Sequence, residues 1–265
     1  MDFQDKFQNI VAKNNSLMCV GLDPELERIK KQTVYKGESL VKFNISIVNQ
    51  TADLVCAYKP NIAFYEALGI EGLEHLKQTI DYLKKNYSDI PIILDAKRAD
   101  IANTAKMYAT AIFDFWGADA TTVYPHLGFD SLEPFFAYKQ KLTIVLIKTS
   151  NPDASTFQNL KMDGEPYYMK VAKEIKKWDI RNLGVFVGAT YPQDLKIVRK
   201  LFPNKIILSA GFGAQKGKIK EAVKAGVDKT GGGIMFNASR SIIFSDNPRL
   251  EAQKLRDEIN KYRTV

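Results

Sequence analysis

Cysteine, histidine and tryptophan are scarce in this chain, and each occurs twice among 265 residues. Cys19 and Cys56 both lie in apolar stretches, so we expect buried, reduced thiols rather than a disulfide framework. Neither His75 nor His126 lies near a cysteine in sequence. This spacing does not match a Cys/His zinc site, and the sequence therefore predicts no bound metal.

Long hydrophobic runs are also lacking. No apolar stretch approaches the roughly 18 residues that a membrane-spanning helix needs, and residues 1–15 have neither the basic nor the apolar region of a signal peptide. The composition of 45% hydrophobic and 26% charged residues is that of an ordinary globular protein, which excludes disordered, collagen-like and coiled-coil chains. We therefore expect a cytoplasmic protein with no membrane partner.

Positive charge is in excess, since 38 Lys and Arg face 30 Asp and Glu for a net charge of +8. Such an excess suits a nucleic acid, an anionic membrane or a small anionic ligand. The lysines are scattered in pairs along helix-like segments and form no basic stripe. A non-enzymatic nucleic-acid binder stays open as an alternative on the charge alone, but no recognised motif supports it, and we expect no nucleic-acid partner.

Short apolar runs recur along the chain, each ending in polar residues or glycine. They cover residues 17–22, 54–58, 91–94, 118–123, 142–147, 183–187, 205–209 and 233–236. Continuous rather than alternating apolar runs are typical of strands buried on both faces, as in parallel sheets. Helical patterns separate the runs, and another covers residues 2–13 ahead of the first.

This alternation predicts an α/β fold, namely a (β/α)8 TIM barrel that spans residues 1–265 as a single domain with an extra N-terminal helix. An open doubly wound sheet remains the alternative, because the fourth and eighth runs are weak strand signals.

The active site of such a barrel lies at the carboxyl ends of its strands, and charged residues gather there in this sequence. Asp95, Lys97 and Asp100 follow the third run, and Lys59 follows the second. Alternating signs allow all four side chains to stay ionised in one pocket. The alternative is an exposed salt-bridge cluster at the rim of the barrel.

Glycines and an arginine follow the last two runs. Gly211, Gly213 and Gln215 come after the seventh run, and Arg240 comes after the eighth. Loops at these positions form the usual phosphate site of the barrel, where backbone N–H groups and an arginine hold the anion. Alternatively, the glycines only make tight turns and Arg240 caps a helix. Residues 151–165 form a long polar stretch after the fifth run, and we interpret them as a lid.

Six motifs in this order resemble the orotidine 5′-phosphate decarboxylase family, and within it the longer-chain group. They are GLDP (21–24), YKPN (58–61), DAKRADI (95–101), KTSN (148–151), GFGAQ (211–215) and NASR (237–240). The D-x-K-x-x-D pattern alone also occurs in metal-dependent sugar-phosphate enzymes of the wider superfamily, so the combination with YKPN and KTSN carries the resemblance. One departure is Ala210, where the family often has proline.

The resemblance implies cofactor-free decarboxylation of orotidine 5′-monophosphate to uridine 5′-monophosphate and CO2, the last step of UMP biosynthesis. In this reaction Lys97 would protonate C6 of the pyrimidine as CO2 leaves. Asp95 would lie against the substrate carboxylate, and Lys59 would bridge the ribose hydroxyls and the carboxylates. No cofactor is expected.

Further residues take roles by the same resemblance. Asp100, Ile101 and Thr104 would reach into the neighbouring subunit's site, which implies a homodimer. The expected substrate contacts are Asp23 and Asn61 on the ribose, Ser150 and Thr149 on the pyrimidine, and Gln215, Ser239 and Arg240 on the phosphate. A metal-dependent sugar-phosphate enzyme is the alternative, and it would need an acidic metal ligand in the place of Lys59.

Overall fold

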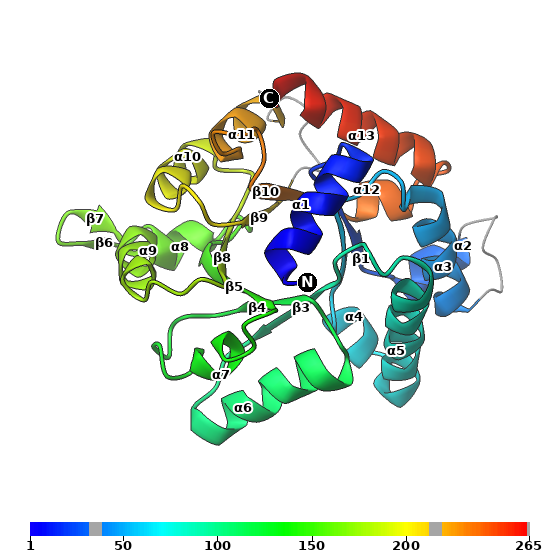
Figure 1. Cartoon of the computed structure of the whole chain (residues 1–265), viewed down its shortest axis with the longest axis horizontal. Coiled ribbons are helices and arrows are strands. Elements are labelled where there is room, and N and C mark those ends of the chain that lie inside the picture. Colours follow the sequence, from blue (N-terminus) through cyan, green and yellow to red (C-terminus); the bar gives the residue numbers. More distant parts are fainter. Residues whose placement is uncertain (32–38, 212–218, 264–265) are drawn as a thin grey trace.

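The computed structural model describes residues 1–31, 39–211 and 219–263. Within these ranges a parallel eight-stranded sheet forms the centre of the molecule, with helices around it (Figure 1). Neighbouring strands follow the order β2-β1-β10-β9-β8-β5-β4-β3. The strands are β1 (Met18–Leu22), β2 (Ala57–Pro60), β3 (Ile93–Arg98), β4 (Ala120–Val123), β5 (Leu142–Lys148), β8 (Leu183–Val187), β9 (Ile207–Ala210) and β10 (Ile234–Ala238).

The two outer strands of this order, β2 and β3, also meet each other. Parallel bridges join Tyr58 to Ile92 and Asn61 to Asp95. These bridges close the sheet into a barrel, so the predicted (β/α)8 fold is confirmed and the open doubly wound sheet is wrong. Each of the eight predicted apolar runs overlaps one barrel strand.

Helices connect the strands and pack on the outside of the barrel. They are α2 (Leu26–Lys31), α3 (Leu40–Thr51), α4 (Ala63–Glu66), α5 (Gly69–Asn86), α6 (Ala102–Thr110) with the π-helical turn η2 (Ala111–Phe115), α7 (Glu133–Phe136), α8 (Ala154–Gln158), α9 (Tyr167–Lys177), α10 (Pro192–Leu201), α11 (Ile219–Gly226), α12 (Arg240–Ile243) and α13 (Pro248–Tyr262). No helix of the described ranges is long and apolar enough to cross a membrane.

The predicted extra helix, α1 (Phe3–Asn14), covers the amino-terminal end of the barrel. Asp2 caps it by accepting a hydrogen bond from the Asp5 N–H at 2.9 Å, and Figure 1 shows it crossing in front of the strands. Lys6 fastens the helix with a 2.7 Å ion pair to Asp119, which directly precedes β4. The opposite end, where the strands end, is the end at which a (β/α)8 barrel carries its active site.

The two strands that carry the predicted catalytic lysines, β2 and β3, run further than their apolar runs predict. The second run was expected to end at residue 58, but β2 continues through Lys59, and β3 continues through Asp95 and Lys97 to Arg98. Strand β2 extends through Lys59 because its backbone continues to pair in parallel with β1, where Lys59 lies opposite Gly21. Backbone pairing does not depend on side-chain polarity, and these charged residues therefore lie in the strands rather than after them.

The predicted lid has secondary structure of its own. Helix α8 occupies its first half, and a small antiparallel hairpin of β6 (Lys161–Met162) and β7 (Glu165–Pro166) follows. Asp163 and Gly164, with φ of 52° and 82°, make the turn between the two strands, and positive φ at both turn residues suits a tight hairpin. The segment is therefore more ordered than a polar loop.

Candidate active site

Three of the four predicted charged residues meet at the carboxyl ends of β2 and β3. Lys59 Nζ lies 2.7 Å from Asp95 Oδ2, and Lys97 Nζ lies 2.6 Å from Asp95 Oδ1. Lys59 Nζ also lies 4.0 Å from Asp23 Oδ1, at the end of β1. The result is a continuous row of alternating charges, which we call the charged cluster (Asp23, Lys59, Asp95 and Lys97).

Burial and pairing together set the charge state of this cluster. Lys59 is 4% exposed and Asp95 is 7% exposed. Burial would raise the pKa of the Asp95 carboxyl, but the ammonium groups of Lys59 and Lys97 outweigh it and hold that pKa well below its usual range. Burial would lower the pKa of Lys59, yet Asp95 and Asp23 raise it above its ordinary value. Lys59 and Asp95 therefore stay ionised around neutral pH.

The backbone of Lys97 has an unusual conformation that aims its side chain. Its φ is 47°, and the register with β4 shifts between Leu94 and Arg98. Thr122 of β4 supports this geometry, because its hydroxyl accepts the Lys97 N–H at 3.0 Å and donates to Asp95 Oδ1 at 2.7 Å. Such irregular strand ends re-aim side chains at active sites. The Lys97 side chain keeps 39% exposure, so it can reach a ligand in the barrel mouth.

The fourth predicted charge, Asp100, does not join the charged cluster of its own chain. Its Oδ1 accepts the Ile101 N–H at 2.8 Å, and in the described part of the chain no ion pair links it to Lys59 or Lys97. Ile101 is 61% exposed, and Thr104 is also exposed. These three residues lie at the start of α6, on its accessible surface.

Several buried oxygens at the barrel mouth accept no hydrogen bond from the described residues. They include Asp23 Oδ1, Thr190 Oγ1, Asn237 Oδ1 and Ser239 Oγ. All four residues lie at or just beyond the carboxyl ends of β1, β8 and β10. Buried polar groups are normally satisfied, so these oxygens are candidates to bind a ligand. Thr190 and Asn237 were not among the predicted site residues.

Close backbone packing brings the predicted residues of β1, β5 and β10 to the same mouth. A Cβ on Gly21 would lie 2.8 Å from Ser239 Cβ, and a Cβ on Gly188 would lie 2.9 Å from Ser150 Cβ. Gly211, with φ of 110°, also approaches Ser150. These glycines thus allow the close approach of Ser150 and Ser239 to neighbouring strand ends.

Other predicted residues are engaged to different extents. Asn61 Oδ1 accepts the Ala63 N–H at 3.2 Å, next to Lys59. The Thr149 hydroxyl donates to Asn151 at 2.7 Å and accepts from Gln158 at 2.8 Å, so contacts within the chain already use it.

Arg240 and Gln215 are two of the side chains that the sequence predicts to bind the phosphate. Arg240 is the first residue of α12 and is exposed, without an ion pair in the described ranges. Gln215 lies outside the described residues.

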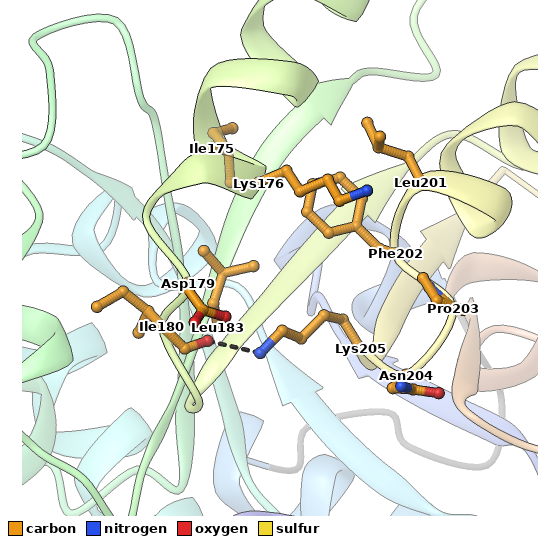
Figure 2. A pocket seen from close by; sticks show the side chains of 10 residues that line it. All are labelled: Ile175, Lys176, Asp179, Ile180, Leu183, Leu201, Phe202, Pro203, Asn204 and Lys205. Atoms are coloured by element: carbon orange, nitrogen blue, oxygen red, sulfur yellow. Dashed lines mark hydrogen bonds between the residues drawn. The ribbon is translucent and has the colours of Figure 1, made fainter.

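A separate pocket lies at the other end of the barrel. Figure 2 shows its lining by residues in the last turns of α9 and α10, by residues that directly follow these helices, and by Leu183, the first residue of β8. Lys205 points across it and donates to the Ile180 carbonyl at 2.6 Å. This pocket contains no member of the charged cluster, so we assign the chemistry to the carboxyl ends of the strands.

The donor set around the charged cluster suits an organic anion better than a metal ion. In the described ranges no group of three or more His, Cys, Asp or Glu is arranged to hold a metal. The ammonium of Lys59 stands between Asp23 and Asp95, and an ammonium group is a hydrogen-bond donor without a lone pair for a metal.

Comparisons with known proteins agree with this geometry. Residues 16–255 match the model of the orotidine 5′-phosphate decarboxylase / HUMPS family. The chain is 42% identical to orotidine 5′-phosphate decarboxylase of Thermomicrobium roseum, covering 99% of this chain and 96% of the relative. It is also 42% identical to that of Cellvibrio japonicus, covering 98% of each.

Solved structures of related proteins share the fold. The OMP decarboxylase of Leishmania donovani superposes with a TM-score of 0.89 at 36% identity, covering 100% of both chains. The enzyme of Methanocaldococcus jannaschii, solved with the inhibitor BMP, has a TM-score of 0.69 at 25% identity and covers 92% of this chain and 98% of its own. By its sequence along nearly its whole length, this chain belongs to the orotidine 5′-phosphate decarboxylase / HUMPS family.

Proposed function

We propose that this chain removes CO2 from orotidine 5′-monophosphate to give uridine 5′-monophosphate, without a cofactor, and that Lys97 is the proton donor. Membership of the family and the 42% identity to named decarboxylases support the reaction. The observation that carries the residue roles is the row Lys59–Asp95–Lys97, with contacts of 2.7 and 2.6 Å. This reaction completes the synthesis of UMP.

The reaction demands a cation beside the carbon that loses CO2. When the bond between C6 and the carboxylate breaks, its electron pair stays on C6, which then takes a proton. The Lys97 ammonium can stabilise this charge as it develops and then donate the proton. Lys97 suits the role better than Lys59, because its side chain is 39% exposed against 6% for Lys59.

Asp95 and Lys59 prepare the site for this step. Asp95 stays negative because two ammonium groups flank it, and a fixed negative charge beside the substrate carboxylate favours the departure of neutral CO2. Lys59 holds Asp95 and Asp23 in place and has donors left for the ribose hydroxyls. The array is held before substrate binds, so little reorganisation accompanies the reaction.

The remaining mouth residues fit the rest of the nucleotide. Asp23 and Asn61 are proposed to bind the ribose, and Ser150 the pyrimidine, with Thr149 acting through its backbone turn. Ser239, Arg240 and Gln215 are proposed to bind the phosphate. Support comes from the buried oxygens of Asp23 and Ser239, which accept no hydrogen bond within the described ranges, and from the exposed guanidinium of Arg240. Binding energy from the distant phosphate can hold the ring against Lys97.

A homodimer would complete each site. Asp100, Ile101 and Thr104 are proposed to enter the partner's site, since Asp100 pairs with none of the lysines of its own cluster. The same stretch exposes large apolar side chains, with Ile101 and Phe115 at 61% and Met107 at 58%. An exposed apolar surface of this kind marks an interaction face.

The test follows the ultraviolet absorbance of orotidine 5′-monophosphate with purified protein in buffer that contains EDTA. Steady conversion to uridine 5′-monophosphate is expected, and its absence under these conditions overturns the proposal. The metal-dependent alternative predicts a different pattern, in which EDTA abolishes activity and Mg²⁺ restores it.

A further inference from the structure

Lys148 is a buried lysine that none of the steps above uses. It is the last residue of β5, and its side chain is 0% exposed. It directly precedes Thr149 and Ser150, which lie at the barrel mouth. A fully buried lysine is rare unless it is paired, so its partners reveal what it does.

The partners of Lys148 come from three different helical regions. Its Nζ donates to Asn159 Oδ1, directly after α8, and lies 4.0 Å from Asp194 Oδ2 in the first turn of α10. The rings of Tyr168 and Tyr191 lie 4.8 and 5.0 Å from the same nitrogen. Cation–π contacts of this kind gain strength when they are desolvated. The ammonium thus ties the end of β5 to the bases of α8, α9 and α10.

A second tie runs beside the first. Gln158 accepts the Thr149 N–H at 2.9 Å, and its Nε2 donates to the Thr149 hydroxyl at 2.8 Å. Residues 158 and 159 therefore fasten to residues 148 and 149, one pair beside the other. Residues 154–166, which include helix α8 and the β6–β7 hairpin, are thus joined through residues 158 and 159 to the strand end that precedes Ser150.

Burying the charged ammonium of Lys148 costs free energy that an apolar side chain packed in the same place would not cost. Burial lowers the pKa of Lys148, and Asp194 opposes this only in part. An apolar side chain of similar length would fill the same space without desolvating an ammonium group. The gain from the charge therefore lies in the directed contact with Asn159.

We propose that Lys148 is a positioning residue, whose ammonium anchors residues 154–166 through Asn159 and thereby fixes the Thr149–Ser150 turn against the pyrimidine. The inference rests on the proposed function for its effect on substrate. Lys148 touches no reacting atom, because its own contacts enclose it completely.

The experiment compares four variants of the full chain, among them the rescue variant Asn159→Asp, with the wild type. Lys148→Met removes the ammonium at similar length, and Asn159→Ala removes its acceptor from an exposed position that does not endanger folding. Lys161→Met is the matched control, since Lys161 lies exposed in the same segment. Backbone amide exchange over residues 154–162, KM and kcat for orotidine 5′-monophosphate, and the Kd of uridine 5′-monophosphate are measured.

Anchoring predicts that Lys148→Met and Asn159→Ala raise amide exchange in the segment about tenfold. KM and the Kd of the product should rise together by about tenfold, with kcat changed much less. Asn159→Asp, which restores an acceptor, should return these values toward wild type, and Lys161→Met should change none of them.

A purely structural lysine would lower the unfolding temperature and the active fraction while leaving KM of the folded enzyme unchanged. That result, or unchanged exchange in both variants, overturns the proposal. Exchange is measured without turnover, so it still decides whether Lys148 anchors the segment if the wild type proves to lack decarboxylase activity.

Discussion

At the scale of single residues, Lys97 combines an unfavourable backbone with the central chemical role. A residue with a side chain seldom adopts a φ of 47°, and the hydroxyl of Thr122 holds it there through the Lys97 N–H. The ammonium of Lys97 lies 2.6 Å from Asp95 Oδ1. The strained backbone of Lys97 directs its ammonium group into the barrel mouth.

Asp95 should make the stability of the protein depend on acid pH. Its folded-state pKa lies below the ordinary value, so the stabilisation is present above about pH 4 and is lost as pH falls toward the folded-state pKa. Asp95→Asn should lower the free energy of unfolding at pH 7 by about 3 kcal/mol. It should also flatten the rise of that free energy between about pH 2 and 4. Urea unfolding at pH 7 and across this acid range measures both effects.

The control for this prediction is Asp89→Asn, which breaks an exposed ion pair with Lys13. It should change the free energy of unfolding by less than about 1 kcal/mol. An Asp95→Asn protein as stable as the wild type at pH 7, with the same pH slope, would show that the charged cluster does not contribute to folding in this way.

Arg240 should act on binding more than on chemistry. Arg240→Ala removes a charge-assisted contact worth about 1.5–3 kcal/mol, so we expect KM to rise by about 10- to 100-fold with a smaller fall in kcat. Arg181→Ala, whose side chain is 92% exposed at the amino-terminal end of β8, should leave both constants unchanged. A fall in kcat at unchanged KM contradicts phosphate binding by Arg240.

The positions of several candidate site residues were predictable from the sequence and those of others were not, for physical reasons. Lys59, Asp95 and Lys97 stood out because charges at the ends of apolar runs have few structural uses. Thr190 and Asn237 were missed, since a hydroxyl or an amide after a strand is common in any turn. Only the structure reveals that their oxygens are buried and accept no hydrogen bond from the residues it describes.

At the scale of elements, the sequence predicted the number and order of the strands better than their ends. Hydrophobicity marks where a strand is buried on both faces, and it stops marking the strand where side chains turn into the barrel mouth. Both β2 and β3 continue past that point. The same limit applies to residues 151–165, where α8 and the β6–β7 hairpin lack the length for a periodic pattern.

The contact between α4 and α5 gives a prediction at this scale. A Cβ on Gly72 of α5 would lie 2.0 Å from the Tyr65 carbonyl oxygen of α4. Although alanine favours a helix over glycine, Gly72→Ala should destabilise the protein by about 1–3 kcal/mol, because the backbone of α4 must move. Thermal unfolding measures the change.

Gly232→Ala is the matched control, since the nearest atom, Thr230 Oγ1, lies 3.4 Å from the added Cβ. Its effect should stay within about 0.5 kcal/mol. A stabilising Gly72→Ala would mean that the two helices are not in close contact at this point.

At the scale of the whole molecule, the first and last strands of the barrel are partners. Met18 of β1 lies opposite Phe236 of β10, and we propose on this basis that residues 1–265 form one domain. Part of the net charge of +8 is concentrated at one end of the barrel. Lys59, Lys97 and Arg240 lie at one end of the barrel, where a substrate with a phosphate and a carboxylate would bind.

A dimer with shared sites makes a distinctive prediction. Lys97→Ala and Asp100→Ala should each be nearly inactive alone. When the two variants are mixed under conditions that exchange subunits, each mixed dimer gains one site with both native residues, because Asp100 acts across the interface. Activity should therefore reappear at up to about one quarter of the wild-type level, half of the dimers being mixed, each with one of its two sites intact. Steady-state assays follow its return.

If Asp100 served its own chain, every site in the mixed dimer would carry one substitution, and mixing would restore nothing. A monomer by sedimentation that keeps full activity would likewise contradict the shared site.

The most direct test of the account measures Lys97→Ala in EDTA-containing buffer, beside the wild type and the exposed control Lys254→Ala. We predict that kcat for orotidine 5′-monophosphate falls by at least about 1,000-fold, while the Kd of uridine 5′-monophosphate by calorimetry stays within about tenfold of wild type. The control should match the wild type in both. Turnover by Lys97→Ala close to the wild-type rate would contradict Lys97 as the proton donor.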